Sequence, residues 1–565
     1  MLVAIAIKIE VVAVSRLWRR LLAVATIVTV AILSFAIAPG TAHAAGTGAI
    51  TVDGTVATRY DAFQIFSATV VDDADAGQKI ATDVMWVNGA VRQAVLPVLR
   101  DAGLDGSAST APEAAEWMNA DGHMTTALTA KLARAIVKAG AVSAALNAGT
   151  KAELPCGYWL IVADDDAISQ NEAGTAPIMA LVGGSAVTVK PKAATPKVSK
   201  HVLEDGTAAW QKAADATVAD DLYWRLSATA PAGLTAYDTY AVRFVDTMSA
   251  GLDPSKVAAS MRVYVAAGAD GGFDAVSAGK DGRAGTDPAK GWTDITAQCK
   301  VSVDGNTFTV RTGDLIAALG GADAFTAGAR VVAVYNAPLN SACNHGIAKG
   351  NPNEAYLRYP RSPFADQSGD AGFTRTPSDD ACAYTWDLAL TKRGSDGDKP
   401  LAGAVLSIAD DRGRTLAADG TWDAEGKATV ATGEDGRVTV SGVDSGKLEV
   451  RELKAPKGYT AFEGTRSVTV KAEGLDVDQV AAAKPKLTIT AESPLRADSA
   501  DGSTGSLEAS LINTPTGTPP SITTGGFMPS TGDMAMYAAA AAAVAGAALI
   551  VVALLVKRGG GSHKE

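Results

Sequence analysis

Apolar residues are concentrated at the two ends of this 565-residue chain, and the stretch between them carries shorter, interrupted runs. The C-terminal run covers residues 534–556, contains no charged side chain and is followed at once by Lys557 and Arg558. A helix of about 20 apolar residues crosses a bilayer. The pattern therefore predicts a transmembrane helix at 534–556 and a basic tail, 557–565, on the cytoplasmic side, with the rest of the chain outside the cell.

The N-terminal run has the features of a secretory signal. Three arginines within residues 16–20 precede the apolar stretch 21–38, and the small-residue site Ala42-His43-Ala44 follows it. This order predicts a signal peptide, 1–44, that is cleaved after Ala44. The alternative is an uncleaved N-terminal anchor helix.

Between the two ends, short runs rich in Val, Thr, Ile and Tyr alternate with Asp-Gly and Pro-Gly breaks, which is typical of many short strands. One stretch differs, because Leu128, Leu132, Ile136 and Ala139 recur at helical spacing before Gly140. We therefore expect an all-β protein of tandem immunoglobulin-like β-sandwiches, the first with a helical insertion, plus an N-terminal signal helix and a C-terminal transmembrane helix.

Changes in composition along the chain indicate the domain boundaries. The length leaves room for about three domains between the hydrophobic ends, and a Pro/Thr/Gly-rich stretch without core-forming periodicity reads as an extended linker. The expected order is signal peptide 1–44, N-terminal domain 45–190, middle β-sandwich 191–381, last β-sandwich 382–514, linker 515–533, transmembrane helix 534–556 and tail 557–565.

Charge and motif content exclude several classes of function. Lys and Arg number 50 against 61 Asp and Glu, a net charge of -11, and no basic cluster in the exported part could neutralise phosphates, so nucleic acid is not an expected partner. The exported region carries His123, His201 and His345 but no zinc-protease, nucleophile-elbow or Cys/His signature. We expect neither a cofactor nor an enzyme that acts on an external substrate.

Metal sites are also not expected. The Asp-x-Ser-x-Ser pattern at 105–109 lacks a preceding buried strand, and the Asp-rich loop 270–287 lacks EF-hand spacing, so both are interpreted as solvated loops. Weak Ca²⁺ binding is the alternative for the Asp-rich loop. None of the cysteines forms a C-x-x-C motif, which disfavours zinc. One or two disulfides are an option in an exported chain, with three full connectivities for Cys156, Cys299, Cys343 and Cys382.

The segment around residue 530 carries a family resemblance. The pentapeptide Met-Pro-Ser-Thr-Gly, the apolar span and the basic tail follow one another in the order found in sortase-anchored surface proteins of Gram-positive bacteria, whose signal is Leu-Pro-x-Thr-Gly. Met in place of Leu is a volume-conserving apolar change. The resemblance implies that a sortase cleaves between Thr531 and Gly532 and links the chain to peptidoglycan, with the motif formed by Met528, Pro529, Ser530, Thr531 and Gly532.

The exported chain more specifically resembles the pilin backbone subunits of these bacteria. "YDAFQIFS", "GYWLIVAD" and "TAPIMALVGG" are similar to an N-terminal pilin domain, and "FVDTMSAGL", "VYNAPLN" and "GNPNEAYLRYP" to an isopeptide-forming middle (CnaA-type) domain. "LALTKRGSDGDKPLAGAVLSI", "VRELKAPKGYT" and "LINTP" are similar to a Cna-B-type (CnaB) domain. The resemblance implies a structural subunit that assembles with other copies of itself and with ancillary pilins.

Polymerising pilins use a lysine of the next subunit, in a Tyr-Pro-Lys-Asn motif, to resolve the sortase thioester. Here Lys192 follows Pro191, but Lys190 stands where Tyr is expected and Ala193 where Asn is expected. The resemblance thus implies Lys192 as the polymerisation lysine, and a solvated linker lysine is the alternative.

The last domain matches the Cna-B positions of an internal isopeptide bond. Lys392 lies in "LALTK", Glu452 in "LEVRE" and Asn513 in "SLIN". The resemblance implies an amide bond between Lys392 and Asn513 with Glu452 as the catalytic acid. Burial favours the uncharged forms of a lysine and a glutamic acid, and a neutral amine is a nucleophile.

The middle domain has a less complete match. Lys200 in "PKVSK" and Asp246 in "FVDTMSAGL" occupy the positions of the lysine and the assisting acid, whereas "YPRSP" replaces the usual Asn-bearing end. Asn353 is the expected acceptor, with Asn351 as the other candidate. The alternative is a domain without the bond that relies on a cysteine pair such as Cys299 and Cys343.

Two functions follow from these expectations. The first is a covalent pilus shaft subunit, anchored by sortase to peptidoglycan and supporting adhesion to a host surface ligand. The second is a single wall-anchored adhesin, or a tip or base pilin, that does not polymerise.

Overall fold

The structure is a computed structural model that describes residues 46–73, 77–139, 144–169, 171–174, 176–191, 195–231, 234–267, 291–321 and 328–517. Several predicted features lie outside these residues: the signal cleavage site Ala44, Lys192, the Asp-rich loop, the sorting motif 528–532 and the span 534–556. Among the described residues, no helix is long and apolar enough to cross a membrane.

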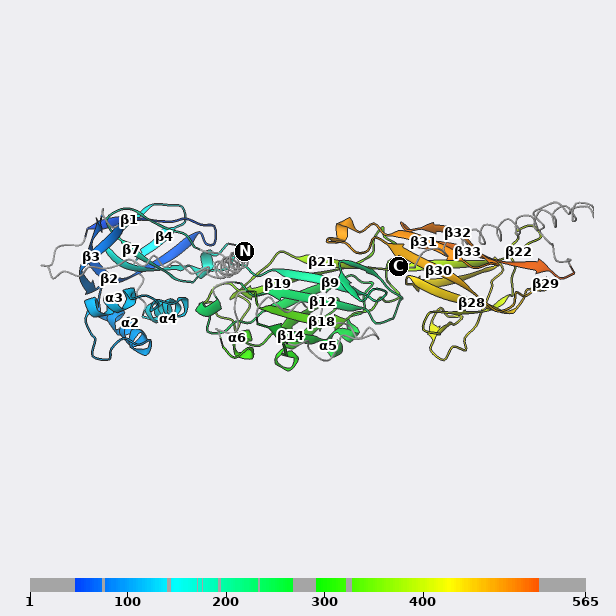
Figure 1. The fold of residues 1–565 in the computed structure, drawn as a ribbon, viewed down its shortest axis with the longest axis horizontal. Coiled ribbons are helices and arrows are strands. Elements are labelled where there is room, and N and C mark those ends of the chain that lie inside the picture. The colour runs from blue at the N-terminus through cyan, green and yellow to red at the C-terminus, as the bar shows by residue number, and fades with distance from the viewer. Residues whose placement is uncertain are drawn as a thin grey trace, which may run out of the picture.

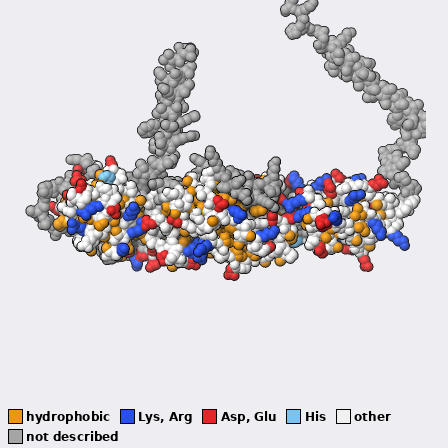
Figure 2. Space-filling view, turned by 90° about the horizontal axis from the view of Figure 1, so that it is seen from below, with side chains coloured by type: hydrophobic (Ala, Val, Ile, Leu, Met, Phe, Trp, Pro, Cys, Tyr) orange, Lys and Arg blue, Asp and Glu red, His pale blue; other side chains and the backbone are white. Residues whose placement is uncertain are grey.

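The described chain forms three β-rich units that follow one another in a row (Figure 1). Each of the middle and last units is built from two facing sheets, so the expected β-sandwich class is confirmed for the described part. Figure 2 shows that positively and negatively charged side chains are interspersed along one long face of the row.

The N-terminal unit combines two sheets with three helices. One sheet has the order β5-β1-β8, and the other has the order β3-β2-β6-β7 with β4 beside β2. Its strands are β1 (Thr47–Val52), β2 (Arg59–Asp73), β3 (Gln78–Trp86), β4 (Ala144–Asn147), β5 (Ala152–Pro155), β6 (Gly157–Ala163), β7 (Ile178–Val182) and β8 (Val187–Val189).

The helical insertion is larger than the sequence pattern predicts. It contains α2 (Gly89–Asp101), α3 (Ala111–Asn119) and α4 (Thr126–Lys138), of which only α4 was expected. Leu128, Leu132 and Ile136 are buried as predicted, whereas Ala139 is exposed. The side chains of Asn88, Thr110 and Thr125 cap the three helices by accepting first-turn N–H groups, which satisfies donors that the helices leave free.

The middle unit packs two sheets, each with six strands in its main order, around one large core. The first has the order β10-β9-β12-β18-β14-β15, and the second has the order β11-β21-β19-β13-β17-β16 with β20 beside β19. Its elements are β9 (Val198–Glu204), β10 (Ala209–Gln211), β11 (Ala213–Asp215), β12 (Tyr223–Thr229), β13 (Arg243–Met248), α5 (Val257–Ser260), β14 (Arg262–Ala266), β15 (Trp292–Asp294), β16 (Lys300–Asp304), β17 (Thr307–Arg311), α6 (Leu315–Ala318), β18 (Arg330–Asn336), β19 (Asn351–Pro360), β20 (Phe373–Arg375) and β21 (Asp379–Tyr384).

The last unit is a smaller sandwich whose first and final strands are neighbours. Its sheets have the orders β27-β22-β33-β29, with β32 beside β33, and β25-β24-β23-β28-β30-β31, with β26 beside β23. Its strands are β22 (Trp386–Gly394), β23 (Val405–Ala409), β24 (Thr415–Leu416), β25 (Trp422–Asp423), β26 (Val430–Ala431), β27 (Arg437–Val443), β28 (Gly446–Lys454), β29 (Tyr459–Thr460), β30 (Thr465–Glu473), β31 (Lys486–Ala491), β32 (Leu495–Asp501) and β33 (Ser506–Pro515).

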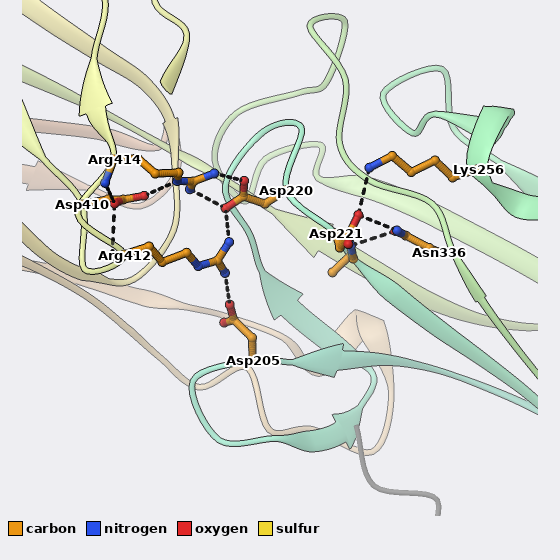
Figure 3. A network of polar contacts seen from close by, with 9 residues as sticks. Asp205, Asp220, Asp221, Lys256, Asn336, Asp410, Arg412 and Arg414 are labelled. Atoms are coloured by element: carbon orange, nitrogen blue, oxygen red, sulfur yellow. Dashed lines mark hydrogen bonds and ion pairs between the residues drawn. The ribbon is translucent and has the colours of Figure 1, made fainter. Parts of the chain in front are cut away.

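An arginine clasp joins the middle and last units (Figure 3). Arg414 donates to both carboxylate oxygens of Asp220, at 2.5 and 2.7 Å, and Arg412 donates to Asp220 at 2.8 Å and to Asp205 at 3.3 Å. Asp410 accepts from Arg414 at 2.7 Å within the last unit, which holds the guanidinium in place. Paired hydrogen bonds from one arginine fix orientation as well as distance, so the clasp limits rotation between the units.

Candidate functional site

The last unit brings the three predicted residues together inside its core. Strand β22 lies parallel to β33, with Lys392 opposite Leu511 and Gly394 opposite Asn513, so Lys392 and Asn513 come from neighbouring strands of one sheet. Glu452 lies on β28 of the facing sheet. All three side chains are buried.

The Glu452 carboxylate contacts both reaction partners. The Asn513 amide nitrogen donates to its two oxygens at 2.9 and 3.0 Å, and Lys392 Nζ lies 3.5 Å from Oε1. The backbone N–H of Phe462 also donates to Glu452 Oε2, at 3.1 Å, and fixes the carboxylate between the lysine and the asparagine. One acid can therefore exchange protons with both groups directly.

Burial also prepares the lysine of this cluster. Removal from water lowers the pKa of Lys392 to about 8, and the nearby Glu452 carboxylate partly offsets this effect. Near neutral pH the uncharged amine is therefore a minor form of Lys392, but a far more populated one than in an exposed lysine. The arrangement suits attack of that amine on the Asn513 carboxamide, with loss of ammonia.

The middle unit holds a second cluster of the same composition between its two sheets. Lys200 on β9 comes from one sheet, and Asp246 on β13 and Asn353 on β19 come from the other. Asp246 pairs with Ala355 and Met248 with Asn353, so the acid and the asparagine are diagonal neighbours on adjacent strands. Lys200 Nζ donates to Asp246 Oδ2, and none of the three side chains is exposed to solvent.

The surroundings of Lys200 are apolar and aromatic. Its ammonium nitrogen lies 5.4 Å from the centre of the Trp224 ring and 5.3 Å from that of Tyr335. Burial lowers the pKa of Lys200 and raises the pKa of Asp246, and their mutual attraction only partly offsets both shifts. Both shifts are in the direction of a neutral amine beside a protonated acid, the protonation states that acyl transfer from an amide needs.

Asn351 and Asn353, the two candidate acceptors of the middle unit, differ in the hydrogen bonds of their side-chain amides. Asn351 accepts from the N–H of Asn344 at 2.8 Å and donates to the carbonyl oxygens of Asn344 and Ala383 at 2.9 and 3.2 Å. Asn353 faces the cluster and donates from Nδ2 to Tyr335 Oη at 2.9 Å. Asn351 thus has a structural role at the end of β19, and Asn353 is the better placed acceptor.

The structure does not support disulfides as the alternative. Within the described residues, Cys156, Cys299, Cys343 and Cys382 are all free. Burial raises the pKa of the Cys299, Cys343 and Cys382 thiols to about 11, which keeps them protonated. The cysteine pair offered for the middle domain is therefore not formed.

Tyr335 is a residue of the middle cluster that the sequence analysis did not single out. It lies at the end of β18 in the quoted motif "VYNAPLN" and is fully buried. Its hydroxyl contacts all three predicted residues. A tyrosine that follows a run of aliphatic residues in this strand was the available signal, because a buried phenol needs a polar partner.

Acidic residues gather at the junction of the middle and last units. Glu204, Asp215 and Asp444 have carboxylate oxygens within 4.8 Å of one another. Asp215 Oδ2 accepts from Trp386 Nε1 at 2.6 Å and from the N–H and hydroxyl of Ser445 at 3.0 and 2.5 Å. Oxygen donors of this kind suit a hard cation, yet Asp215 is already engaged in these bonds, and we assign the cluster to the junction rather than to a metal site.

The acidic loop singled out at 105–109 is a local turn. Asp105 Oδ1 accepts from the N–H of Ser107 at 2.7 Å and from its hydroxyl at 2.5 Å, and both residues are exposed. This is the hydrogen-bond pattern of an Asx turn.

Comparison with known proteins adds a family match. Residues 387–484 match the family described as SpaA, prealbumin-like fold domain. The chain is also 30% identical over 143 residues to the trypsin-resistant surface T6 protein of Streptococcus pyogenes serotype M6, and the match covers 24% of this chain and 24% of that protein. It thus spans about a quarter of the length of this curated relative.

Two solved pilin structures match along most of the chain. The T6 backbone pilin of serotype M6 Streptococcus pyogenes matches with a TM-score of 0.44 and 16% identity, covering 84% of this chain and 100% of that chain. The full-length major pilin SpaD of Corynebacterium diphtheriae matches with a TM-score of 0.40 and 15% identity, covering 83% of this chain and 98% of that chain. Residues 387–484 thus match the SpaA prealbumin-like fold family, and the chain is related over about a quarter of its length to the trypsin-resistant surface T6 protein.

Proposed function

We propose that the chain is a structural shaft subunit of a surface pilus, stabilised by two internal isopeptide bonds. The observation that carries the proposal is the presence of two buried Lys, acid and Asn clusters, one in each of two consecutive β-sandwiches. Buried charged groups are costly and are rarely kept without a purpose. In the last domain Lys392 and Asn513 react with the help of Glu452, and in the middle domain Lys200 and Asn353 react with the help of Asp246.

The chemistry proposed for the last domain is one acyl transfer. Lys392 Nζ attacks Asn513 Cγ, Glu452 takes a proton from the amine and delivers it to Nδ2, and ammonia leaves. The new amide joins the first strand β22 to the final strand β33. The crosslink closes a loop from Lys392 to Asn513. In the loop-entropy model it stabilises the folded domain by about 4–5 kcal/mol, because it reduces the conformational freedom of the unfolded chain.

Assembly on the cell surface is the further part of the proposal. The N-terminal signal exports the chain, sortase cleaves between Thr531 and Gly532, and the Thr531 carbonyl is transferred to Lys192 of another copy or to peptidoglycan. The signal, Lys192 and the sorting motif all lie outside the described residues, so this part rests on the sequence alone.

A denaturing gel of cell-wall extracts tests the assembly. A shaft subunit gives a heat-stable ladder of multiples, whereas one band supports a wall-anchored adhesin or an ancillary pilin. Lys192→Arg keeps the charge but removes a usable nucleophile, so it should abolish the ladder. Thr531→Ala should leave the chain membrane-bound or secreted, and wall linkage that survives this change would overturn the sorting-motif assignment.

A further inference from the structure

The two clusters differ in how the acid reaches the asparagine. In the last unit, Glu452 accepts hydrogen bonds from Asn513 Nδ2 directly, at 2.9 and 3.0 Å. In the middle unit, the Asn353 amide nitrogen donates to Tyr335 Oη at 2.9 Å, and Tyr335 in turn donates to Asp246 Oδ2 at 2.8 Å. The phenol hydroxyl thus stands between the acid and the leaving nitrogen.

Tyr335 also contacts the attacking atom. Lys200 Nζ donates to Tyr335 Oη at 2.8 Å as well as to Asp246 Oδ2. One oxygen therefore touches the nucleophile, the acid and the leaving group, all in a site from which solvent is excluded. No water needs to enter the core to connect these groups.

We propose that Tyr335 is a catalytic residue of the middle domain that carries the proton from Asp246 to the departing nitrogen of Asn353. The inference rests on the isopeptide reaction proposed above and adds a residue that the last domain does not need.

The departing nitrogen of Asn353 must gain one proton before it can leave as ammonia. The bond between Lys200 Nζ and Asn353 Cγ forms, the bond between Cγ and Nδ2 breaks, and the products are one amide and one ammonia. Attack makes Cγ tetrahedral, which gives Nδ2 a free lone pair, so this nitrogen changes from a hydrogen-bond donor into an acceptor. Tyr335 then gives its proton to Nδ2, takes one from Asp246, and Asp246 is restored by the proton that leaves Nζ.

The position of the Tyr335 ring is set by packing independent of the hydroxyl. The ring meets Phe308 edge to face, with centroids 4.7 Å apart, and its strand pairs Tyr335 with Trp224. Replacement by phenylalanine keeps these apolar contacts. A change at this position can therefore remove the hydroxyl and leave the core filled.

The test is the rate at which the full-length chain loses ammonia from its middle domain. Tyr335→Phe and a matched control, Tyr359→Phe, are expressed in parallel and followed by intact mass spectrometry and peptide mapping. Tyr359 is a fully buried tyrosine on β19 whose hydroxyl has no hydrogen-bond partner among the described residues. The bond of the last domain, which should form in every variant, is an internal control for the folding of that domain in each chain.

The expected result is a slowing of about 10²-fold or more in Tyr335→Phe, the usual range for loss of a proton-transfer group, and no slowing in Tyr359→Phe. Equal rates in the two variants would overturn the inference. Absence of the middle bond from the unchanged protein would instead overturn the proposed reaction, so the two failures are distinguishable.

A second variant separates proton transfer from a merely structural role, because a Tyr335→Phe chain with a disturbed fold loses the bond equally whatever the leaving group is. Asn353→Asp replaces ammonia by water as the leaving group, and the departing hydroxyl depends less on protonation than the departing amino group, because hydroxide is a much weaker base than an amide anion. Tyr335→Phe should slow bond formation in both backgrounds, but by different factors. The factor in the Asn353→Asp background should be at least about ten times smaller than the factor in the unchanged chain. An equal loss in both backgrounds would show that Tyr335 only holds the site in shape, which would overturn its catalytic role.

Discussion

Lys392 and Asn513 occupy neighbouring parallel strands, with the side chain of Glu452 from the opposite sheet lying against both. A covalent link between Lys392 and Asn513 would therefore lie within one sheet. The Lys200 and Asn353 side chains come from opposite sheets, so a link between them would join the two halves of the sandwich.

Replacement of the acid should prevent the link in the last domain. Glu452→Ala removes the group that exchanges protons with both partners, so the product should retain one ammonia relative to the bonded chain, as measured by intact mass. Loss of the closed loop should lower the melting temperature of the domain by roughly 15 °C or more, from the loop-entropy value of about 4–5 kcal/mol. The control is Glu449→Ala, an exposed residue on the same strand that pairs with Lys447.

Substitution of the two asparagines of β19 should have different effects. Asn353→Ala removes the acceptor, and peptide mapping should then find Lys200 unmodified. Asn351→Ala should keep the bond and lower the free energy of unfolding by about 2–3 kcal/mol, because three hydrogen bonds in the core are lost. A crosslink mapped to Asn351 would show that the acceptor is wrongly assigned.

Disruption of the clasp should loosen the junction of the middle and last units. Asp220→Ala leaves Arg412 and Arg414 without their shared partner, so distances measured between spin labels on the two units should spread over a wider range. Both isopeptide bonds should still form, because neither cluster touches the clasp. Arg437→Ala, which removes a pair with Glu508 inside the last unit, should leave the distance distribution narrow.

The same junction should weaken as the pH rises. Burial and the neighbouring Asp215 raise the pKa of Glu204 to about 8, and burial also raises the pKa of Asp444 well above its usual range. The folded protein holds these protons more tightly than the unfolded chain does. Glu204 therefore makes its full contribution to the free energy of unfolding below the ordinary glutamate pKa of about 4.5. This contribution is lost as the pH rises through the folded-state pKa of about 8.

Hydrogen exchange at the junction, compared between pH 5 and pH 9 after correction for the intrinsic rate, measures this loss. Faster opening at the higher pH is expected in the unchanged protein. Glu204→Gln carries no titratable proton and should reduce the difference, and an unchanged difference would assign the pH dependence to other groups.

The sequence predicted the β-sandwich class because strand periodicity and turn residues are local signals that tertiary packing here reinforces. The same signals missed α2 and α3. Pro97 interrupts the pattern of α2, and α3 has only nine residues, so its capping box at Thr110 and Glu113 was a stronger signal than its periodicity.

The candidate clusters were only partly visible in the sequence. Lys392, Glu452 and Asn513 could be named because they belong to a recognisable motif order, and the structure brings them together. The sequence could mark Tyr335 only as a buried phenol that needs a polar partner, since its role depends on the alignment of β18 across the core from β13 and β19. The choice between Asn351 and Asn353 likewise depended on which amide lies at the cluster, because both side chains are buried on the same face of β19.

The positions of the two clusters also decide how tension would travel along an assembled fibre. With both amides formed, a pull entering before Lys200 crosses to Asn353, follows the chain to Lys392 and crosses again to Asn513, so most of each sandwich carries no load. The route runs through the short connection from Tyr384 to Trp386, where the clasp and the Asp215 hydrogen bonds brace the two units. The stiffness of such a fibre would then depend on this non-covalent joint more than on the sandwiches themselves.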